Sequence, residues 1–328
     1  MTTAFYTHAD CRLHEMGAGH PESPARLQAI EDQLIASRLD SLFDHREAPL
    51  ATPPMICRVH DAAMLDLMRA RSPARVAGSK PGESYAALGP DAVLNAYTLD
   101  AALRAAGAAV AATDAVIAGE VENAFCSVRP PGHHALRAQA MGFCFFNNVA
   151  IAAQHALAVH GLSRIAVVDF DVHHGNGTQE AFEGDQRVLM VSFFQHPFYP
   201  FTGVATAGEG YDNDGKRYSS DNMINQPLPA YTGGNVVRRL VKEVWLPALH
   251  AHRPEMLFIS AGFDAHREDD IGQMGLVEDD YAWITRELMT VARQHAGGRI
   301  VSCLEGGYNL SALGRSVVAH LKALAQLD

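Results

Sequence analysis

The chain has 328 residues, of which 48% are hydrophobic, a length and composition that predict a large folded core rather than a disordered chain. Its net charge of -11 argues against nucleic-acid binding, which needs a basic surface, and is compatible with a cationic substrate. The five cysteines form no CxxC pair, and neither a signal peptide nor a run of eighteen apolar residues is visible, so we expect a cytoplasmic protein with no membrane partner.

The first third of the chain predicts one strand and three helices. Residues 3–7 have a β-like pattern. Apolar residues recur at helical spacing in 23–39, where Ser23 suits the cap and Pro24 the first position of a helix. Residues 60–71 and 98–118 predict two more helices, and the intervening segment 72–90, rich in Gly, Pro and Ser, predicts a loop.

From residue 123 onward, apolar strands alternate with helices. The predicted strands are 123–128, 164–169, 187–194, 256–261 and 299–304. The predicted helices are 145–160, a short one near 178–184, 234–252, 278–296 and a last one from about 311, with an irregular loop before 234. Because the strands are almost continuously apolar, we predict one α/β domain over residues 1–328, with a mainly parallel sheet flanked by helices.

Ionisable, glycine-rich or aromatic segments follow all five of these strands. In chain order they are RPPGHHA, DFDVHHGNG, QHPFYPFTG, GFDAHREDD and EGGYN. The carboxyl edge of an open parallel sheet is where its loops converge and ligands bind. The sequence therefore predicts a functional site at this edge.

Part of this site has the composition of a metal centre. Asp171 and His173 share one side of an extended segment, with His174 on the other, and Asp264 can join them from another strand end. Two carboxylates and one imidazole suit a catalytic zinc ion with an open position, and Fe²⁺ fits the same donors. A salt-bridged network of Asp and His side chains is the structural alternative.

Further residues have the chemistry of proton transfer. His133 and His134 are not needed as ligands, and free imidazoles titrate near neutrality, so they are candidates for general base and acid. Asp169 and Asn176 can orient them. Tyr308 can donate a hydrogen bond to an oxyanion. The alternatives are a histidine pair that caps a strand end and a tyrosine that only packs its ring.

Six segments in order resemble the motif series of the zinc-dependent histone deacetylase family: GHPESPARL, RPPGHHA, GFCFFNNVAIA, DFDVHHGNGTQ, SAGFDAH and EGGY. That family includes class II-like bacterial amidohydrolases and acetylpolyamine amidohydrolases. The resemblance implies the arginase-deacetylase fold, with a mainly parallel eight-stranded sheet, and hydrolysis of an N-acyl amide on a lysine-like amine. The partner would be an acyl-lysine peptide or protein, or a small acylated amine; a homo-oligomer stays open.

The resemblance also implies roles for single residues. The zinc ligands would be Asp171, His173 and Asp264. His134 would be the general base and later acid, with Asn176 orienting it; His133 would be its companion, oriented by Asp169; Tyr308 would hold the carbonyl oxygen. Substrate would contact Asp91, Gly142, Phe143, Tyr199 and Ile271, and Arg26 would lie near an inner cavity. A structural potassium ion would bind near Asp169, Asp171, His173, Ser192 and Phe193.

The sequence departs from the family pattern at several positions. Asn176 replaces an Asp of some members, as in the class II branch. Phe201 stands where relatives with YPGTG have Gly, and Ala92 replaces a common Thr beside Asp91. Ile271 stands where polyamine-selecting relatives can carry Glu, which favours acyl-lysine and leaves acetylpolyamines as the alternative substrate.

Two other functions are considered on the same residues. A binuclear manganese ureohydrolase shares the fold but needs a second carboxylate in the SAGFDAH segment, where Gly262 stands. A non-catalytic binder of acyl-lysine would have lost a metal ligand, His134 or Tyr308, and all of these are present.

Overall fold

The computed structural model describes residues 2–75, 81–204 and 221–327, and its main feature is one eight-stranded sheet. The strand order is β2-β1-β5-β10-β9-β6-β7-β8, and every neighbouring pair is parallel. The strands are β1 (Thr3–Thr7), β2 (Asp44–Glu47), β5 (Asn123–Cys126), β6 (Ile165–Asp169), β7 (Val188–Gln195), β8 (Met223–Leu228), β9 (Met256–Ala261) and β10 (Ile300–Leu304). The predicted α/β class with a parallel eight-stranded sheet is confirmed.

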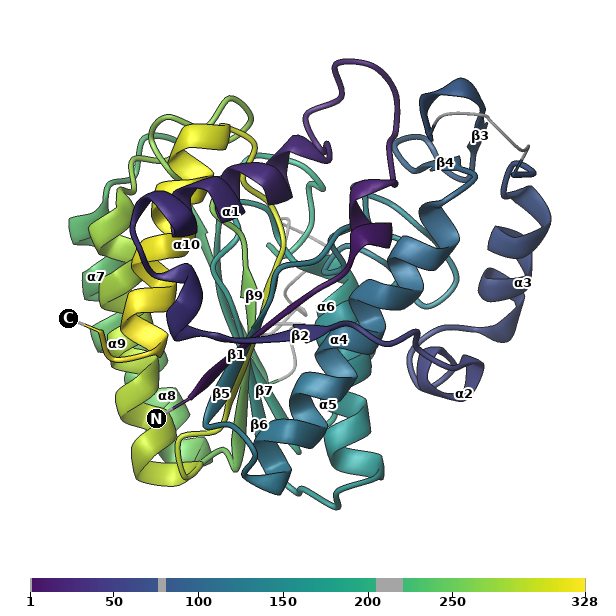
Figure 1. Cartoon of the computed structure of the whole chain (residues 1–328). Helices are drawn as coiled ribbons and strands as arrows, with labels where there is room; N and C mark the ends of the chain where they lie inside the picture. Colours follow the sequence, from purple (N-terminus) through teal and green to yellow (C-terminus); the bar gives the residue numbers. More distant parts are fainter. Residues whose placement is uncertain (1, 76–80, 205–220, 328) are drawn as a thin grey trace, which may run out of the picture.

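Helices cover both faces of this sheet, as Figure 1 shows. One side carries α4 (Thr98–Ala118), α5 (Asn148–Ala158) and α6 (Asn176–Phe182); the other carries α1 (Ala25–Ala36), α7 (Gly234–Leu240), α8 (Leu246–His252), α9 (Glu278–His295) and α10 (Leu310–Leu324). The central strands β5, β6, β9 and β10 are buried at every residue, which explains why they are almost continuously apolar.

Neither of the two outermost strands was predicted from the sequence. β2 has the sequence DHRE, without an apolar residue, and within the described residues it pairs with β1 alone. β8, MINQPL, lies in the segment predicted as an irregular loop, and β7 is its one partner strand in the described part of the chain. Edge strands tolerate charge and proline because one side of each makes no ladder bonds, so these two lack the apolar signal of the interior strands.

Other local differences concern short elements. The predicted loop 72–90 contains a 3₁₀ turn (Pro81–Glu83) and β3 (Tyr85–Ala87), which pairs antiparallel with β4 (Val93–Asn95); residues 76–80 lie outside the described part. Three more turns of helix were not predicted: Ala9–Arg12, Asp40–Leu42 and α2 (Pro53–Ile56). The helix predicted from 60 is α3 (Ala62–Arg71).

The ends of two predicted helices also differ. No side chain caps α1: Pro24 is the cap residue, and Ser23 contributes its carbonyl group, which accepts the N–H of Arg26 at 3.1 Å. The helix predicted over 234–252 is continuous, but a π-helical turn (Val241–Trp245) separates α7 from α8.

Helix α4 is long and apolar enough to pass a test for a membrane-spanning helix, although the sequence contains no uninterrupted run of eighteen apolar residues. Its mean hydropathy is 1.4 over the apolar window, and 67% of that window is buried inside the structure. A buried core helix passes the same test. The side chains of α4 that face inward are mostly alanine, and the helix packs against α5 and β5, as a core helix does.

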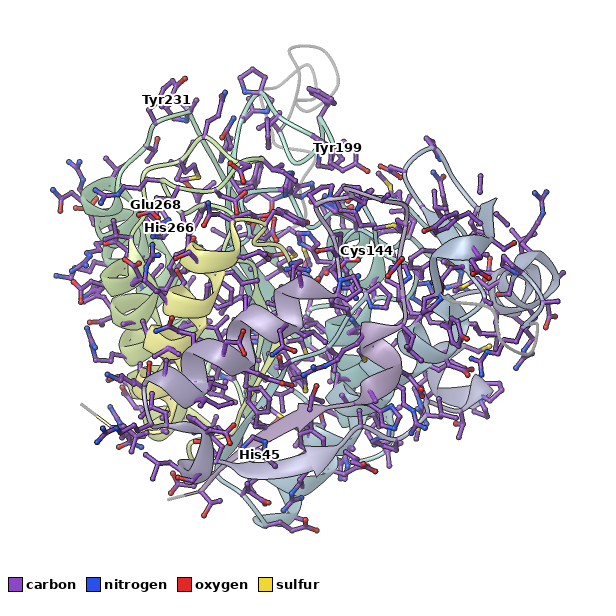
Figure 2. The ribbon with its side chains drawn as sticks, turned by 45° about the horizontal axis from the view of Figure 1, so that its top comes forward. His45, Cys144, Tyr199, Tyr231, His266 and Glu268 are labelled. Carbon is purple, nitrogen blue, oxygen red and sulfur yellow. The ribbon has the colours of Figure 1, made fainter. Side chains whose placement is uncertain are left out.

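The parallel sheet places the loops that follow β5, β6, β7, β9 and β10 at one end of the molecule. Figure 2 shows Tyr199 and Tyr231 on loops at the top of the view, whereas His45 of the edge strand β2 lies far below them. The five segments that the sequence singled out therefore share one end of the sheet.

Candidate active site

Three side chains of metal-ligating types meet where β6 and β9 end. Asp171 and His173 follow β6, Asp264 follows β9, and one ligand atom of each lies within 4.8 Å of the others. Nδ1 of His173 is 2.9 Å from Oδ1 of Asp171 and 3.3 Å from Oδ2 of Asp264. All three residues are buried.

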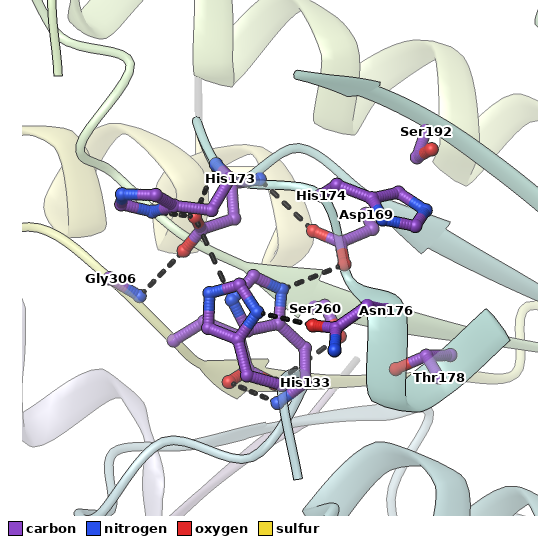
Figure 3. A network of polar contacts seen from close by, with 12 residues as sticks. His133, Asp169, His173, His174, Asn176, Thr178, Ser192, Ser260 and Gly306 are labelled. Carbon is purple, nitrogen blue, oxygen red and sulfur yellow. Dashed lines mark hydrogen bonds and ion pairs between the residues drawn. The ribbon is translucent and has the colours of Figure 1, made fainter. Parts of the chain in front are cut away.

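Backbone groups hold both carboxylates in place. The N–H of Gly306 donates to Oδ2 of Asp171 at 2.9 Å (Figure 3), and that of Val172 donates to Oδ1 of Asp264 at 2.9 Å. The other oxygen of each carboxylate is thereby left facing His173. Oδ2 of Asp264 is buried and accepts no hydrogen bond within the described part of the chain, an arrangement that a bound cation satisfies.

Two converging carboxylates shift the pKa values within this cluster. Burial lowers the pKa of His173, but the carboxylates of Asp171 and Asp264 next to its ring outweigh burial and raise it to about 9. Burial, together with the charge of Asp171, raises the pKa of Asp264 to about 6. A proton on His173 thus stands where two carboxylates converge, and metal binding would displace it.

Gly262 leaves no room for the second carboxylate of a binuclear centre. A Cβ atom at this position would lie 2.0 Å from Oδ2 of Asp171, which real contacts never allow. Any side chain here would displace Asp171, so the donor set suits one metal ion.

A second group of metal-binding side chains lies apart from this edge. Nε2 of His155 and Nε2 of His160 are 2.7 and 2.6 Å from Oδ1 of Asp114 on α4. Arg58 lies 3.3 Å from Nδ1 of His155, and an arginine can only donate, so the ring proton is on Nε2 and points at Asp114. Hydrogen bonds among these side chains therefore account for this group without a metal ion.

The adjacent histidines 133 and 134 have different partners. Nδ1 of His133 is 3.0 Å from Oδ2 of Asp169, and Nδ1 of His134 is 2.7 Å from Oδ1 of Asn176 (Figure 3). The amide oxygen only accepts, so His134 carries its proton on Nδ1 and keeps the lone pair on Nε2 when neutral.

The pKa values of these two imidazoles are shifted in opposite directions. Burial disfavours charge on His133, but Asp171 and Asp169 outweigh it and hold its pKa well above the usual value. Burial and the nearby His133 and His173 hold the pKa of His134 well below it. One imidazole is therefore charged and the other neutral at pH 7, as an acid–base pair requires.

Tyr308 lies on the loop that follows β10, against the same centre. Its backbone N–H donates to Oδ2 of Asp269 at 2.7 Å, and the guanidinium of Arg26 lies 4.9 Å from its ring centre. Arg26 is fully buried and donates to the carbonyl of Gly307 at 2.7 Å. Burial keeps the pKa of the phenol well above its usual value, so the hydroxyl remains a donor.

Two segments place aromatic rings beside the histidines and Tyr308. The Phe143 ring lies 6.1 Å from that of Tyr308 and 4.6 Å from that of His20. Gly142 precedes it with φ +56°, and a Cβ there would lie 2.3 Å from the His134 ring, so only glycine fits.

The loop that follows β7 supplies the opposite aromatic residues. Tyr199 lies 5.3 Å from the His134 ring, and its hydroxyl donates to Oδ2 of Asp91 at 2.7 Å. Phe198 stacks on His173 with 5.2 Å between ring centres. The structure thus brings Asp91, Phe143 and Tyr199 to the site with the histidines.

The remaining predicted residues lie around this centre. Ile271 donates its N–H to Oδ1 of Asp269, whose other oxygen holds Tyr308. Ser192 pairs in register with Asp169, and Phe193 follows it on β7, beside the predicted potassium position. His174 points away from the metal ligands: Nδ1 lies 2.8 Å from Thr202, and Nε2 lies 2.9 Å from Gln179.

The sequence reasoning missed four contributors to this site. Phe198 and His20 lie beside residues that had been singled out, and their contacts depend on how separate loops meet. Glu305, whose carboxyl group accepts the N–H of His133 at 3.1 Å, begins the EGGY segment, and Asp269 belongs to the acidic run EDD after SAGFDAH. Their positions in or next to motifs were the available signal.

The comparisons with known proteins agree with this geometry. The model of the histone deacetylase domain matches residues 20–324. The chain is 38% identical to a histone deacetylase-like amidohydrolase of Pseudomonas aeruginosa, over 89% of this chain and 73% of the relative. It is 36% identical to the polyamine deacetylase HDAC10 of Homo sapiens, over 99% of this chain and 48% of the relative.

A solved structure extends the likeness to the fold. The HD domain of HDA15 superposes with a TM-score of 0.88 at 34% sequence identity, over 99% of this chain and 88% of that domain. A parallel eight-stranded sheet, the ordered motifs at one edge and a match over nearly the whole chain agree with one another: the chain belongs to the histone deacetylase family.

Proposed function

We propose that the protein is a zinc-dependent amidohydrolase that removes an acetyl or other acyl group from the amine of a lysine side chain. Family membership supports a deacetylase, a hydrolase of amide bonds. The observation that carries the zinc proposal is the cluster of Asp171, His173 and Asp264 next to an imidazole whose pKa is lowered.

The donor set fits zinc. Asp171, Nδ1 of His173 and Oδ2 of Asp264 would hold the ion, and the last of these is the buried oxygen that accepts no hydrogen bond in the described chain. Three protein ligands leave a coordination position for substrate or water. When bound, zinc supplies Lewis acidity, which activates water and polarises the acyl carbonyl. Fe²⁺ fits the same donors.

His134 is the proposed base. Its Nδ1–H is held by Asn176, so Nε2 offers a lone pair that takes a proton from the attacking water. The same nitrogen then gives the proton to the departing amine. Burial and the neighbouring His133, which is charged and held by Asp169, keep the pKa of His134 low, so that His134 stays neutral before the reaction.

Tyr308 is the proposed oxyanion donor. Its phenol remains protonated because burial raises its pKa, and it can donate to the carbonyl oxygen as negative charge develops there. Its backbone is fixed through Asp269, which limits the reorganisation needed during the reaction.

The substrate would enter between aromatic rings. Phe143 with Gly142 on one side and Tyr199 on the other would flank an alkyl stem. Asp91, fixed by the Tyr199 hydroxyl, keeps a buried oxygen, Oδ1, that accepts no hydrogen bond in the described chain and could accept a substrate N–H. Ile271 would lie near the entrance and favours acyl-lysine over a polycation.

A small acylated amine is the second candidate substrate. The 36% identity to a human polyamine deacetylase supports it. We also propose a structural potassium ion near Asp169, Asp171, His173, Ser192 and Phe193, and a cytoplasmic protein that binds neither nucleic acid nor membrane; a homo-oligomer stays open.

The test is hydrolysis of an acetyl-lysine peptide beside acetylputrescine and acetylspermidine, with the His134→Ala variant as control. We expect peptide turnover that the substitution lowers about 10²–10⁴-fold and that a zinc-chelating hydroxamate abolishes. Turnover of the acetylated polyamines alone would show that the substrate is a small acylated amine and not acyl-lysine. Equal turnover by the His134→Ala protein would contradict the proposed base.

A further inference from the structure

Glu305 is a buried carboxyl group that none of the roles above uses. It follows β10 directly and is fully buried. Its Oε2 accepts the N–H of Gly132 at 2.6 Å and the N–H of His133 at 3.1 Å. Its Oε1 accepts the hydroxyl of Ser260 at 3.2 Å. One side chain therefore binds the turn that carries the two catalytic imidazoles.

The main chain of Glu305 is also held on both sides. Its N–H donates to the carbonyl of Ala261 at 2.9 Å, and its carbonyl accepts from Nη2 of Arg26 at 2.5 Å. The next residue, Gly306, donates to Asp171 at 2.9 Å. The carboxyl group is thus a fixed point that has little freedom to follow a displaced turn.

The Glu305 carboxyl group links two loops that follow different strands, one carrying Tyr308 and the other carrying His134. Tyr308 lies three residues further along the same segment, while His134 lies one residue beyond the N–H that Glu305 binds. The base and the oxyanion donor must be placed relative to one another, and a misplacement of about 1 Å can cost about 10²-fold in rate.

We propose that Glu305 is a positioning residue: its carboxyl oxygen holds the Gly132–His133 turn and thereby places His134 relative to Tyr308. This inference rests on the proposed function, because the role of His134 in proton transfer is what makes its placement matter. The acceptor oxygen, not the charge, performs this role.

The protonation of Glu305 is consistent with that distinction. Burial raises its pKa to about 7, so the charged and neutral forms coexist near neutrality. Oε2 can accept both N–H groups in either form. A glutamine keeps an acceptor oxygen and can turn its amide N–H toward Ser260, whereas a methionine of similar size offers no comparable acceptor.

The first experiment compares Glu305→Met with Glu305→Gln on the acetyl-lysine peptide, using zinc-loaded protein. We expect Glu305→Met to lower kcat about 10²-fold. KM should stay within about threefold of the wild-type value, since the residues proposed to bind the substrate are unchanged. Glu305→Gln should stay within about fivefold of the wild type. A glutamine variant as impaired as the methionine variant would overturn the proposal.

A double-mutant cycle separates positioning from general damage. In the His134→Ala background, Glu305→Met should lower kcat by less than about threefold, because the group it positions is already gone. The same large factor in both backgrounds would show a structural defect and overturn the proposal. If Glu305→Met does not fold, Glu305→Gln decides alone: a 10²-fold loss contradicts the account.

A measurement without turnover distinguishes this inference from the proposed function. If the wild-type protein hydrolyses none of the acylated amines, the proposed function fails, and the ¹⁵N signals of the His134 ring still report its position. Those signals should shift in Glu305→Met and remain in place in Glu305→Gln. Unchanged signals in Glu305→Met would overturn the positioning role.

Discussion

At the scale of single residues, the site differs from a plain Asp/His network in the contrast between neighbours. His133 and His134 are adjacent, yet their pKa values move in opposite directions, because two carboxylates outweigh burial at His133, whereas burial and two neighbouring imidazoles together lower the pKa of His134. A network made only of salt bridges would favour a positive charge on both imidazoles. A neutral His134 beside the cluster of Asp171, His173 and Asp264 is the arrangement that general-base catalysis needs.

The proposed role of the Tyr308 hydroxyl can be tested by a substitution that removes its oxygen atom alone. Tyr308→Phe should lower kcat about 10²–10³-fold, because it removes a donor to the developing oxyanion and leaves the ring contacts with Phe143 and Arg26. Steady-state kinetics on the acetyl-lysine peptide measure the loss, and thermal unfolding checks the fold. Kinetics equal to the wild type would assign Tyr308 to packing.

Gly262 offers a test of the metal centre. Gly262→Ala places a Cβ 2.0 Å from Oδ2 of Asp171 and should displace that ligand. We expect zinc affinity, measured by competition with a chromogenic chelator, to fall at least about tenfold. Gly233→Ala is the matched control, since its backbone, like that of Gly262, lies outside the left-handed region and no atom lies within 4 Å of the added Cβ. Equal affinities for the two variants would contradict this geometry.

At the scale of elements, the loops that follow the parallel strands were predictable and the sheet edges were not. The buried strands and the motifs at their carboxyl ends carry strong local signals, so the candidate site could be located from the sequence. β2 and β8 lack apolar runs because they lie at the edges. The contacts of Glu305 and Phe198 join segments far apart in the chain, and no local pattern encodes such meetings.

One buried histidine between elements predicts an effect of acid on stability. His60 donates Nδ1–H to the carbonyl of Leu136 at 2.9 Å, and its Nε2 accepts the N–H of Asn147 at 2.9 Å. Protonation would break the second bond, and burial lowers the pKa to about 4. The unfolded chain, with a pKa of about 6.5, binds this proton first as pH falls.

The sign of the effect follows from that order. Because the folded pKa is the lower one, the contribution of His60 is complete above pH 6.5 and is lost as pH falls toward 4, on the order of 3 kcal/mol in all. Urea unfolding at pH 7 and pH 4.5 measures it. His60→Gln should lose less free energy of unfolding over this interval than the wild type; an equal loss would contradict the assignment.

At the scale of the whole molecule, one hydrophobic core extends from β1 to α10. We therefore expect one cooperative thermal transition, with equal calorimetric and van't Hoff enthalpies. Zinc in hundredfold excess over its Kd should raise the free energy of unfolding by about 2.7 kcal/mol, because it binds the folded state. Two resolved transitions in calorimetry would contradict the single domain.

The central claim is a mononuclear metal site that enables amide hydrolysis, and stepwise zinc addition to metal-stripped protein tests it most directly. Acetyl-lysine peptide hydrolysis should be absent without metal, rise linearly with added zinc and level off at one equivalent per chain. Activity that persists in metal-free protein, or that levels off only at two equivalents, would contradict the account.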